Sequence, residues 1–100
     1  MPCPYMQYMS RVEKNIIVMN KKGLHARPAV LFVQMADKFD VAVTIAKGEE
    51  QINGKSIMAL LMLGAQYKTP LRVTIDGDDA QRAADAIEEF FAKQEEDLTP

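Results

Sequence analysis

The most informative segment of the chain is Gly23-Leu24-His25-Ala26-Arg27-Pro28-Ala29, where a polar turn that ends in glycine meets the start of an apolar helical run. It contains the only histidine among the 100 residues. If His25 caps the helix, the free backbone N–H groups of Ala26 and Arg27 and the positive end of the helix dipole point toward whatever its ring carries. The segment therefore predicts an anion site at a helix N-terminus.

The residue types in this segment suit a phosphoryl group. Histidine has a neutral, nucleophilic form near pH 7, and the guanidinium fork of Arg27 matches phosphate oxygens. Pro28 is tolerated in a first helical turn because its missing N–H has no intrahelical partner there. We expect His25 to be the phosphoryl acceptor and Arg27 its clamp, with the backbone of Ala26 and Arg27 binding phosphate. A plain capping or surface histidine remains the alternative on this segment alone.

Hydrophobic patterns on both sides of this segment predict the element order strand, helix, strand, strand, helix, strand, helix. Strands are expected within residues 11–20, at 41–45, around Ile52 and at 71–75, and helices at 26–37 and 57–63. A last helix is expected after the acidic residues Asp76, Asp78 and Asp79, with Ala83, Ala84, Ile87 and Phe91 along one face. Short alternating strands have one apolar face, which favours a mostly antiparallel four-stranded sheet covered on that side by all three helices. The expected class is α+β.

Composition limits the classes of function. Hydrophobic residues at 48% and charged residues at 26% indicate one globular domain, and a net charge of −2 argues against nucleic-acid binding. No apolar stretch approaches the about 20 residues that span a bilayer, so we expect a cytoplasmic protein without membrane insertion. Cys3 has no companion Cys or His for a disulfide or a zinc site. We expect no metal, no cofactor and a monomer.

The ends of the chain are expected to lie outside the domain. Residues 1–10 predict a disordered extension, in which Met9 is a candidate start. Residues 11–94 are expected to form the domain, and residues 95–100 an acidic tail.

A second motif, Gly54-Lys55-Ser56, precedes the short helical run. It resembles the end of a phosphate-binding loop, but five residues rather than four separate Gly48 from Gly54 and two of them are acidic, so the spacing argues against an ATPase. Ser56 is a good helix N-cap, and Gly64 a good helix end. Ser56 is also a candidate phosphorylation site, because a phosphate of about −2 charge is tolerated at a helix N-terminus.

The helical run at 57–63 is apolar nearly all round. A short surface helix cannot bury every side, so we expect Leu60 and Leu63 to point inward and Ile57, Met58 and Leu61 to point at least partly outward as an adaptable docking patch. Burial of all of them in the core is the alternative.

Together, the two motifs and Leu63-Gly64 resemble HPr, the phosphocarrier family of the bacterial phosphoenolpyruvate-dependent phosphotransferase system, over about Arg11 to Lys93. The resemblance implies an open-faced β-sandwich of order βαββαβα. It also implies a carrier rather than an enzyme, in which His25 takes phosphate on Nδ1 from enzyme I and passes it to an enzyme IIA domain. Arg27 and the helix N-terminus would steady the phosphoryl group.

The resemblance also assigns roles around the second motif. It implies that Ser56 is a regulatory serine modified by HPr kinase/phosphorylase, and that Ile57, Met58 and Leu61 belong to the partner-docking surface. Lys68 stands where the family usually has a turn glycine, so the turn must accept a non-glycine residue at positive φ or be reshaped. The run at 57–63 also resembles the nitrogen-related paralogue of HPr. A nitrogen-type or purely regulatory protein is therefore the alternative function.

Overall fold

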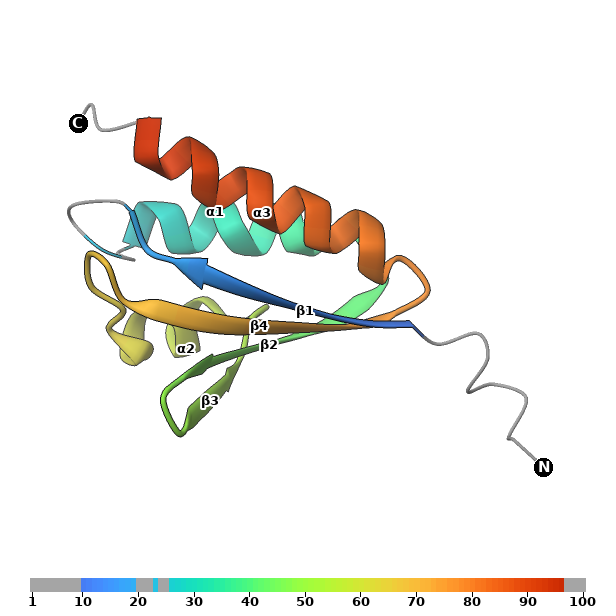
Figure 1. Cartoon of the computed structure of the whole chain (residues 1–100), viewed down its shortest axis with the longest axis horizontal. Helices are drawn as coiled ribbons and strands as arrows, with labels where there is room; N and C mark the ends of the chain where they lie inside the picture. Colours follow the sequence, from blue (N-terminus) through green and yellow to red (C-terminus); the bar gives the residue numbers. More distant parts are fainter. Residues whose placement is uncertain (1–9, 20–22, 24–25, 97–100) are drawn as a thin grey trace.

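The computed structural model describes residues 10–19, 23 and 26–96. Its elements follow the predicted order (Figure 1). They are β1 (Ser10–Ile17), α1 (Ala26–Ala36), β2 (Val41–Lys47), β3 (Glu50–Asn53), α2 (Ile57–Leu63), β4 (Pro70–Gly77) and α3 (Ala80–Glu96).

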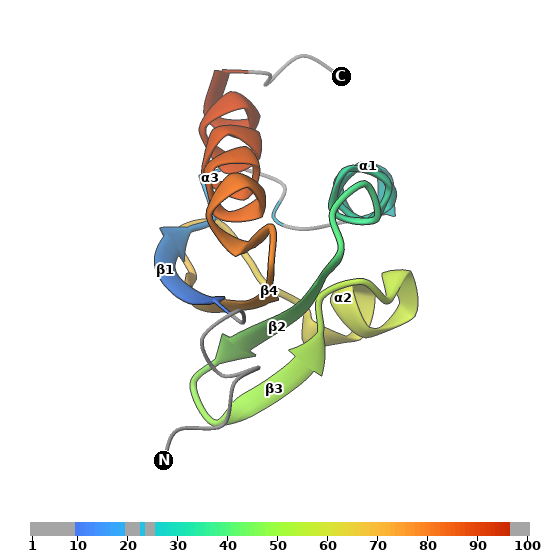
Figure 2. The same ribbon diagram turned by 90° about the vertical axis from the view of Figure 1, so that its right-hand side faces the viewer.

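The four strands form one sheet in the order β1-β4-β2-β3, with every neighbouring pair antiparallel. Thr74 in the central strand β4 pairs with Glu13 on one side and Thr44 on the other, so side chains of the same face align across the sheet. Figure 2 shows all three helices on one side of the sheet. The predicted class, an α+β open-faced sandwich with three helices on one face, is confirmed.

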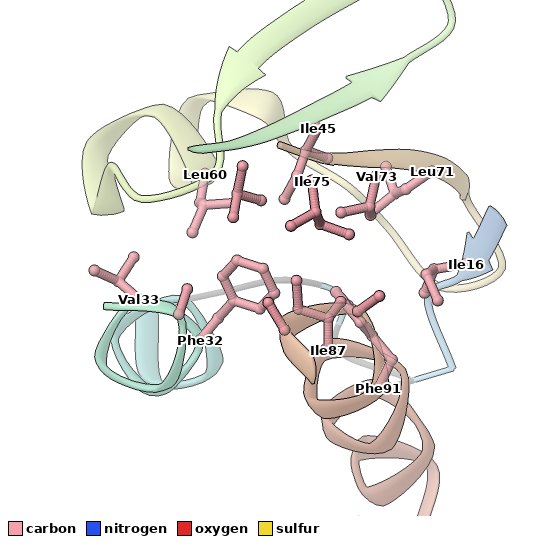
Figure 3. Packing of buried hydrophobic residues seen from close by; sticks show 14 of the residues in the cluster. Ile16, Phe32, Val33, Ile45, Leu60, Leu71, Val73, Ile75, Ile87 and Phe91 are labelled. Atoms are coloured by element: carbon pink, nitrogen blue, oxygen red, sulfur yellow. The ribbon is translucent and has the colours of Figure 1, made fainter. Parts of the chain in front are cut away.

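The core lies between the sheet and the helices. Period-two alternation in β4 turns Leu71, Val73 and Ile75 toward the helices and leaves the intervening side chains on the other face. Figure 3 shows these side chains facing Ile87 and Phe91 of α3. Phe32 and Val33 of α1 and Leu60 of α2 complete the same cluster. The ring of Phe32 in α1 lies 5.5 Å from that of Phe90 in α3, edge to face, which joins the two helices.

The opposite face of the sheet is polar. It carries Arg11, whose Nε donates to Oδ1 of Asp76 at 2.8 Å, together with Thr44, Thr74 and Arg72 around a shallow hollow. Within the described ranges, no helix is long and apolar enough to cross a membrane.

Several element boundaries differ from those predicted. β1 starts at Ser10, inside the predicted extension, because that residue pairs with Gly77. The strand ends at Ile17, although the apolar run continues; Val18 is buried and exchanges backbone hydrogen bonds with Lys68 and Thr69 outside the regular ladder. α3 continues through Glu95 and Glu96, which the sequence assigned to a tail. Residues 1–9 and 97–100 lie outside the described residues.

The turn before β4 keeps a left-handed residue without a glycine. Lys68 has φ of 70°, and its N–H donates to the carbonyl of Val18 at 2.6 Å. Its ammonium lies 5.4 Å from the centre of the Tyr67 ring. Of the two alternatives for this turn, acceptance of a non-glycine residue is the one that the structure adopts.

Lys68→Gly is expected to stabilise the protein by about 1 kcal/mol, because a side chain in the left-handed region costs about that much and glycine does not. Urea unfolding of the two proteins measures the difference. Lys68→Ala is the control, since it removes the contact with the Tyr67 ring but keeps the strained backbone. A glycine variant no more stable than the alanine variant would show that the turn carries no strain.

Candidate functional site

The first turn of α1 carries the predicted phosphate-binding residues. The helix begins at Ala26, the residue directly after His25 in the sequence, and His25 itself lies outside the described residues. Ala26 and Arg27 are exposed, whereas Pro28 and Ala29 are buried and anchor the helix on the core. The first N–H groups of a helix have no intrahelical acceptor. The amides of Ala26 and Arg27 therefore lie at an exposed positive helix end.

No residue of α1 neutralises this helix end from within its first turn, which contains no Asp or Glu. Carboxylates are favoured at such positions, and one there would compete with an incoming anion for the free amides. Arg27 adds a full positive charge on an exposed side chain. The first turn is thus electrostatically prepared for an anion that approaches from solvent.

Gly23, which precedes α1 in the sequence, packs against the chain that follows α2. The residue is buried with φ of 75°, and a Cβ atom built on it would lie 2.7 Å from the carbonyl oxygen of Ala65. Only glycine permits this approach at this backbone conformation. Because Ala65 follows α2 by two residues, the contact places Gly23 at the end of α2. Figure 1 accordingly shows the start of α1 and the last turn of α2 at the same end of the molecule.

The turn in front of α2 explains the second motif. Oδ1 of Asn53 accepts from the backbone N–H of Lys55 at 2.9 Å, and the carbonyl of Asn53 accepts from the N–H of Ser56 at 3.1 Å. Gly54 packs so closely on β2 that a Cβ atom would lie 2.5 Å from Cγ1 of Val43. Gly54 therefore allows the backbone to pack closely against β2. This agrees with the spacing between Gly48 and Gly54, which argues against a nucleotide-binding loop.

Ser56 is the N-cap of α2. Its backbone is extended, with φ of −109° and ψ of 115°, and its Oγ accepts from the N–H of Ala59 at 3.2 Å. Gly64 closes the helix in the left-handed conformation. The predicted helix bounds, Ser56 cap and Gly64 end are confirmed; modification of Ser56 stays a prediction.

Ser56→Ala is expected to lower the free energy of unfolding by about 1 kcal/mol, since the N–H of Ala59 loses its acceptor. Thermal or urea unfolding measures the loss. Ser56→Asp keeps an oxygen at this position and should remain close to the wild type. If both variants are destabilised equally, the hydrogen bond to Ala59 is not the cause.

The two faces of α2 divide as predicted. Leu60 and Leu63 are buried, and Figure 3 shows Leu60 directed toward Phe32 and Val33 of α1. Ile57, Met58 and Leu61 are exposed. Met62 is also exposed, which the sequence reasoning missed although it lies one helical turn after Met58. The role of these residues in docking remains a prediction.

Two lysines beside α2 were not identified from the sequence. Nζ of Lys47 in β2 donates to the carbonyl of Leu63 at 2.7 Å, and Nζ of Lys55 donates to the carbonyl of Phe39 at 3.0 Å. Both contacts span 16 residues of sequence, so no local pattern could indicate them. The part of the chain that the structure describes contains no group of three or more His, Cys, Asp or Glu side chains that could hold a metal ion.

The fold and this site define a class of protein: an open-faced α+β domain with an anion site at a helix start. The positive N-terminal end of α1 is exposed to solvent, and α2 contains no charged residue. A family model described as "PTS HPr component phosphorylation site" matches residues 12–93. This chain therefore belongs to the HPr family of phosphocarrier proteins.

Individual relatives agree with this assignment. The chain is 41% identical over 80 residues to the phosphocarrier protein HPr of Xylella fastidiosa, covering 80% of this chain and 90% of the relative. It is 37% identical over 79 residues to the phosphocarrier protein NPr of Shewanella violacea, covering 79% and 87%. Among solved structures, HPr-C-His of Thermoanaerobacter tengcongensis is similar with a TM-score of 0.82 and 35% identity, covering 88% of this chain and 99% of the other.

Proposed function

We propose that this chain accepts a phosphoryl group on Nδ1 of His25 from phospho-enzyme I and passes it to enzyme IIA domains. The observation that carries the proposal is the start of α1 at Ala26, directly after the only histidine, with Arg27 exposed and no carboxylate in the first turn. Membership of a family whose matching model is a phosphorylation site supports it.

The chemistry needs a nucleophile and a cradle. Neutral imidazole forms the new P–N bond as the bond between phosphorus and the donor breaks, so the phosphoryl group changes its carrier without water taking part. Arg27 and the free amides at the start of α1 stabilise the phosphoryl oxygens. Transfer onward reverses these steps on an acceptor. An exposed site suits a group that two larger proteins must reach in turn, and we infer a monomer that works in the cytoplasm.

Ser56 is the proposed site of regulation by an HPr kinase/phosphorylase. Ser56 is half-buried, and its Oγ already accepts from the N–H of Ala59. A phosphate of about −2 charge there would stand next to Ile57, at the edge of the exposed apolar side chains of α2. Because a charge must be desolvated when an apolar partner covers it, phosphorylation is expected to weaken docking.

Incubation with enzyme I and phosphoenolpyruvate tests the proposal. The expected product is a phosphoprotein whose label is lost in acid and kept in base, as phosphohistidine requires. No label with an enzyme I that phosphorylates another HPr in the same experiment would reject the proposal.

A nitrogen-type or purely regulatory role is the second candidate. It is favoured by the absence of any charged residue in α2 and by the similarity to an NPr. Complementation of sugar uptake in a strain that lacks its own carrier separates the two functions. Restored uptake supports the sugar carrier; phosphorylation of His25 without uptake supports the alternative.

A further inference from the structure

The C-terminal end of α2 is stabilised by a cation from another element. The last turn of α2 contains no basic residue, and the last carbonyl groups of a helix have no intrahelical partner. Nζ of Lys47, the last residue of β2, donates to the carbonyl of Leu63, the last residue of α2, at 2.7 Å. A positive charge is favoured at this end of a helix. Lys47 therefore supplies from the sheet the charge that the helix end lacks.

Lys47 makes this contact although an acidic residue lies beside it. Glu50 is its cross-strand partner in the β2–β3 hairpin and is exposed. Lys47 itself is half-buried, and a charge-assisted hydrogen bond in such surroundings is stronger than an exposed ion pair. Figure 1 shows the end of β2 at the same end of the molecule as the last turn of α2 and the start of α1. The contact joins the end of α2 to the end of β2.

The chain between α2 and β4 is thus bound at both of its ends. At the α2 end, Lys47 binds the carbonyl of Leu63. At the β4 end, the N–H of Lys68 donates to the carbonyl of Val18 at 2.6 Å, and the carbonyl of Thr69 accepts from the N–H of Val18 at 3.0 Å. Of these two attachments, the one made by Lys47 depends on a side chain, so a substitution can remove it.

Gly23 packs on the middle of this connection. A Cβ atom built on Gly23 would lie 2.7 Å from the carbonyl oxygen of Ala65 and 3.1 Å from Cα of Gln66. His25 stands between Gly23 and Ala26, the first residue of α1, in the sequence. Residues 24 and 25 must span the distance between Gly23 and Ala26, so a shift of the connection that moves Gly23 changes this distance.

We propose that Lys47 is a positioning residue for phosphoryl transfer to His25, because its hydrogen bond to Leu63 sets the place of the backbone on which Gly23 packs. This inference rests on the proposed function. Transfer requires the acceptor nitrogen to be aligned with the phosphorus atom, and a misplacement of about 1 Å slows such a step strongly. Lys47 acts through the backbone and not on the phosphoryl group. Its loss therefore slows transfer within the complex with enzyme I and leaves formation of that complex unchanged.

The test is a rapid-quench measurement of phosphoryl transfer from phospho-enzyme I to the full chain over a range of chain concentrations. Lys47→Met keeps an unbranched side chain but cannot donate to the carbonyl of Leu63. Its maximal transfer rate is expected to fall about tenfold. The chain concentration that gives half of the maximal rate should stay within about twofold of the wild type. Circular dichroism at the same temperature checks that the variant is folded.

Two control variants separate the hydrogen bond from charge. Lys47→Arg restores a donor and should transfer within about threefold of the wild-type rate. Lys14→Met removes the same charge elsewhere, since Nζ of Lys14 lies 3.7 Å from Oε1 of Glu88 where β1 meets α3. It should leave both kinetic parameters within about twofold of the wild type, because a general loss of electrostatic attraction would act on both variants. If Lys47→Met does not fold, Lys47→Gln, with a shorter and uncharged side chain, takes its place with the same expected result.

Three results overturn the inference. They are a maximal rate of Lys47→Met equal to that of Lys14→Met, a change confined to the half-saturating concentration, and a rate of Lys47→Arg as low as that of Lys47→Met. The final amount of acid-labile label distinguishes this failure from failure of the proposed function. A wild-type chain that is fully labelled beside a Lys47→Met variant of wild-type rate remains a carrier and loses only the positioning role of Lys47. A wild-type chain that receives no label rejects both proposals.

Discussion

His25→Ala is expected to reduce phosphorylation by enzyme I and phosphoenolpyruvate at least about 1,000-fold, because loss of a nucleophile removes the bond-forming step itself. No other histidine is present in the sequence to take its place. The measurement is incorporation of label from phosphoenolpyruvate, followed by exposure to acid and to base.

Arg27→Ala is the matched comparison for this result, since it changes the same exposed turn and keeps the acceptor. Loss of one stabilising group is expected to slow transfer about 100-fold while the final amount of acid-labile label is unchanged. Retention of acid-labile label by His25→Ala contradicts the assignment of the acceptor. Transfer at the wild-type rate in Arg27→Ala would show that Arg27 does not act as the phosphate clamp, but it would leave the proposal that the chain is a phosphocarrier intact.

The sequence predicted best the elements marked by two independent signals. α2 has both a capping serine and a terminal glycine around a helical run, and its bounds agree with the structure at both ends. β1 has only an apolar run to mark it. Its limits are set by its pairing with β4, and this pairing runs from Ser10 to Ile17 of β1. Strand ends are decided by the partner strand, which local periodicity does not contain.

The candidate site divides in the same way. His25, Arg27 and Ser56 could be proposed because a helix start is a local feature with local chemical signals. The hydrogen bonds of Lys47 and Lys55 could not, because they depend on how β2 and α2 come together in three dimensions. The exposure of Met62 lies between these cases: helical spacing from Met58 indicates it once the orientation of Leu60 is known.

Gly23 connects the fold to the site, which makes its replacement informative. A Cβ atom at this residue would lie 2.7 Å from the oxygen of Ala65 and 3.1 Å from Cα of Gln66, and both are backbone atoms that cannot move independently. The residue also has φ of 75°. Strain and clash act together, so Gly23→Ala is expected to lower the free energy of unfolding by about 2–4 kcal/mol. Urea unfolding measures the loss.

Gly48→Ala separates the two causes. Gly48 has φ of 62°, but a Cβ atom there would meet nothing within 4 Å, so only the backbone strain of about 1 kcal/mol applies. A loss in Gly23→Ala clearly larger than in Gly48→Ala assigns the excess to the contact between Gly23 and the backbone of Ala65 and Gln66. Relief of that contact must move Gly23, which stands two residues before His25 in the sequence. Gly23→Ala is therefore also expected to slow phosphorylation under conditions where it remains folded, whereas Gly48→Ala is not. Equal stability losses and equal phosphorylation rates in the two variants would mean that the contact with Ala65 does not hold the site in place.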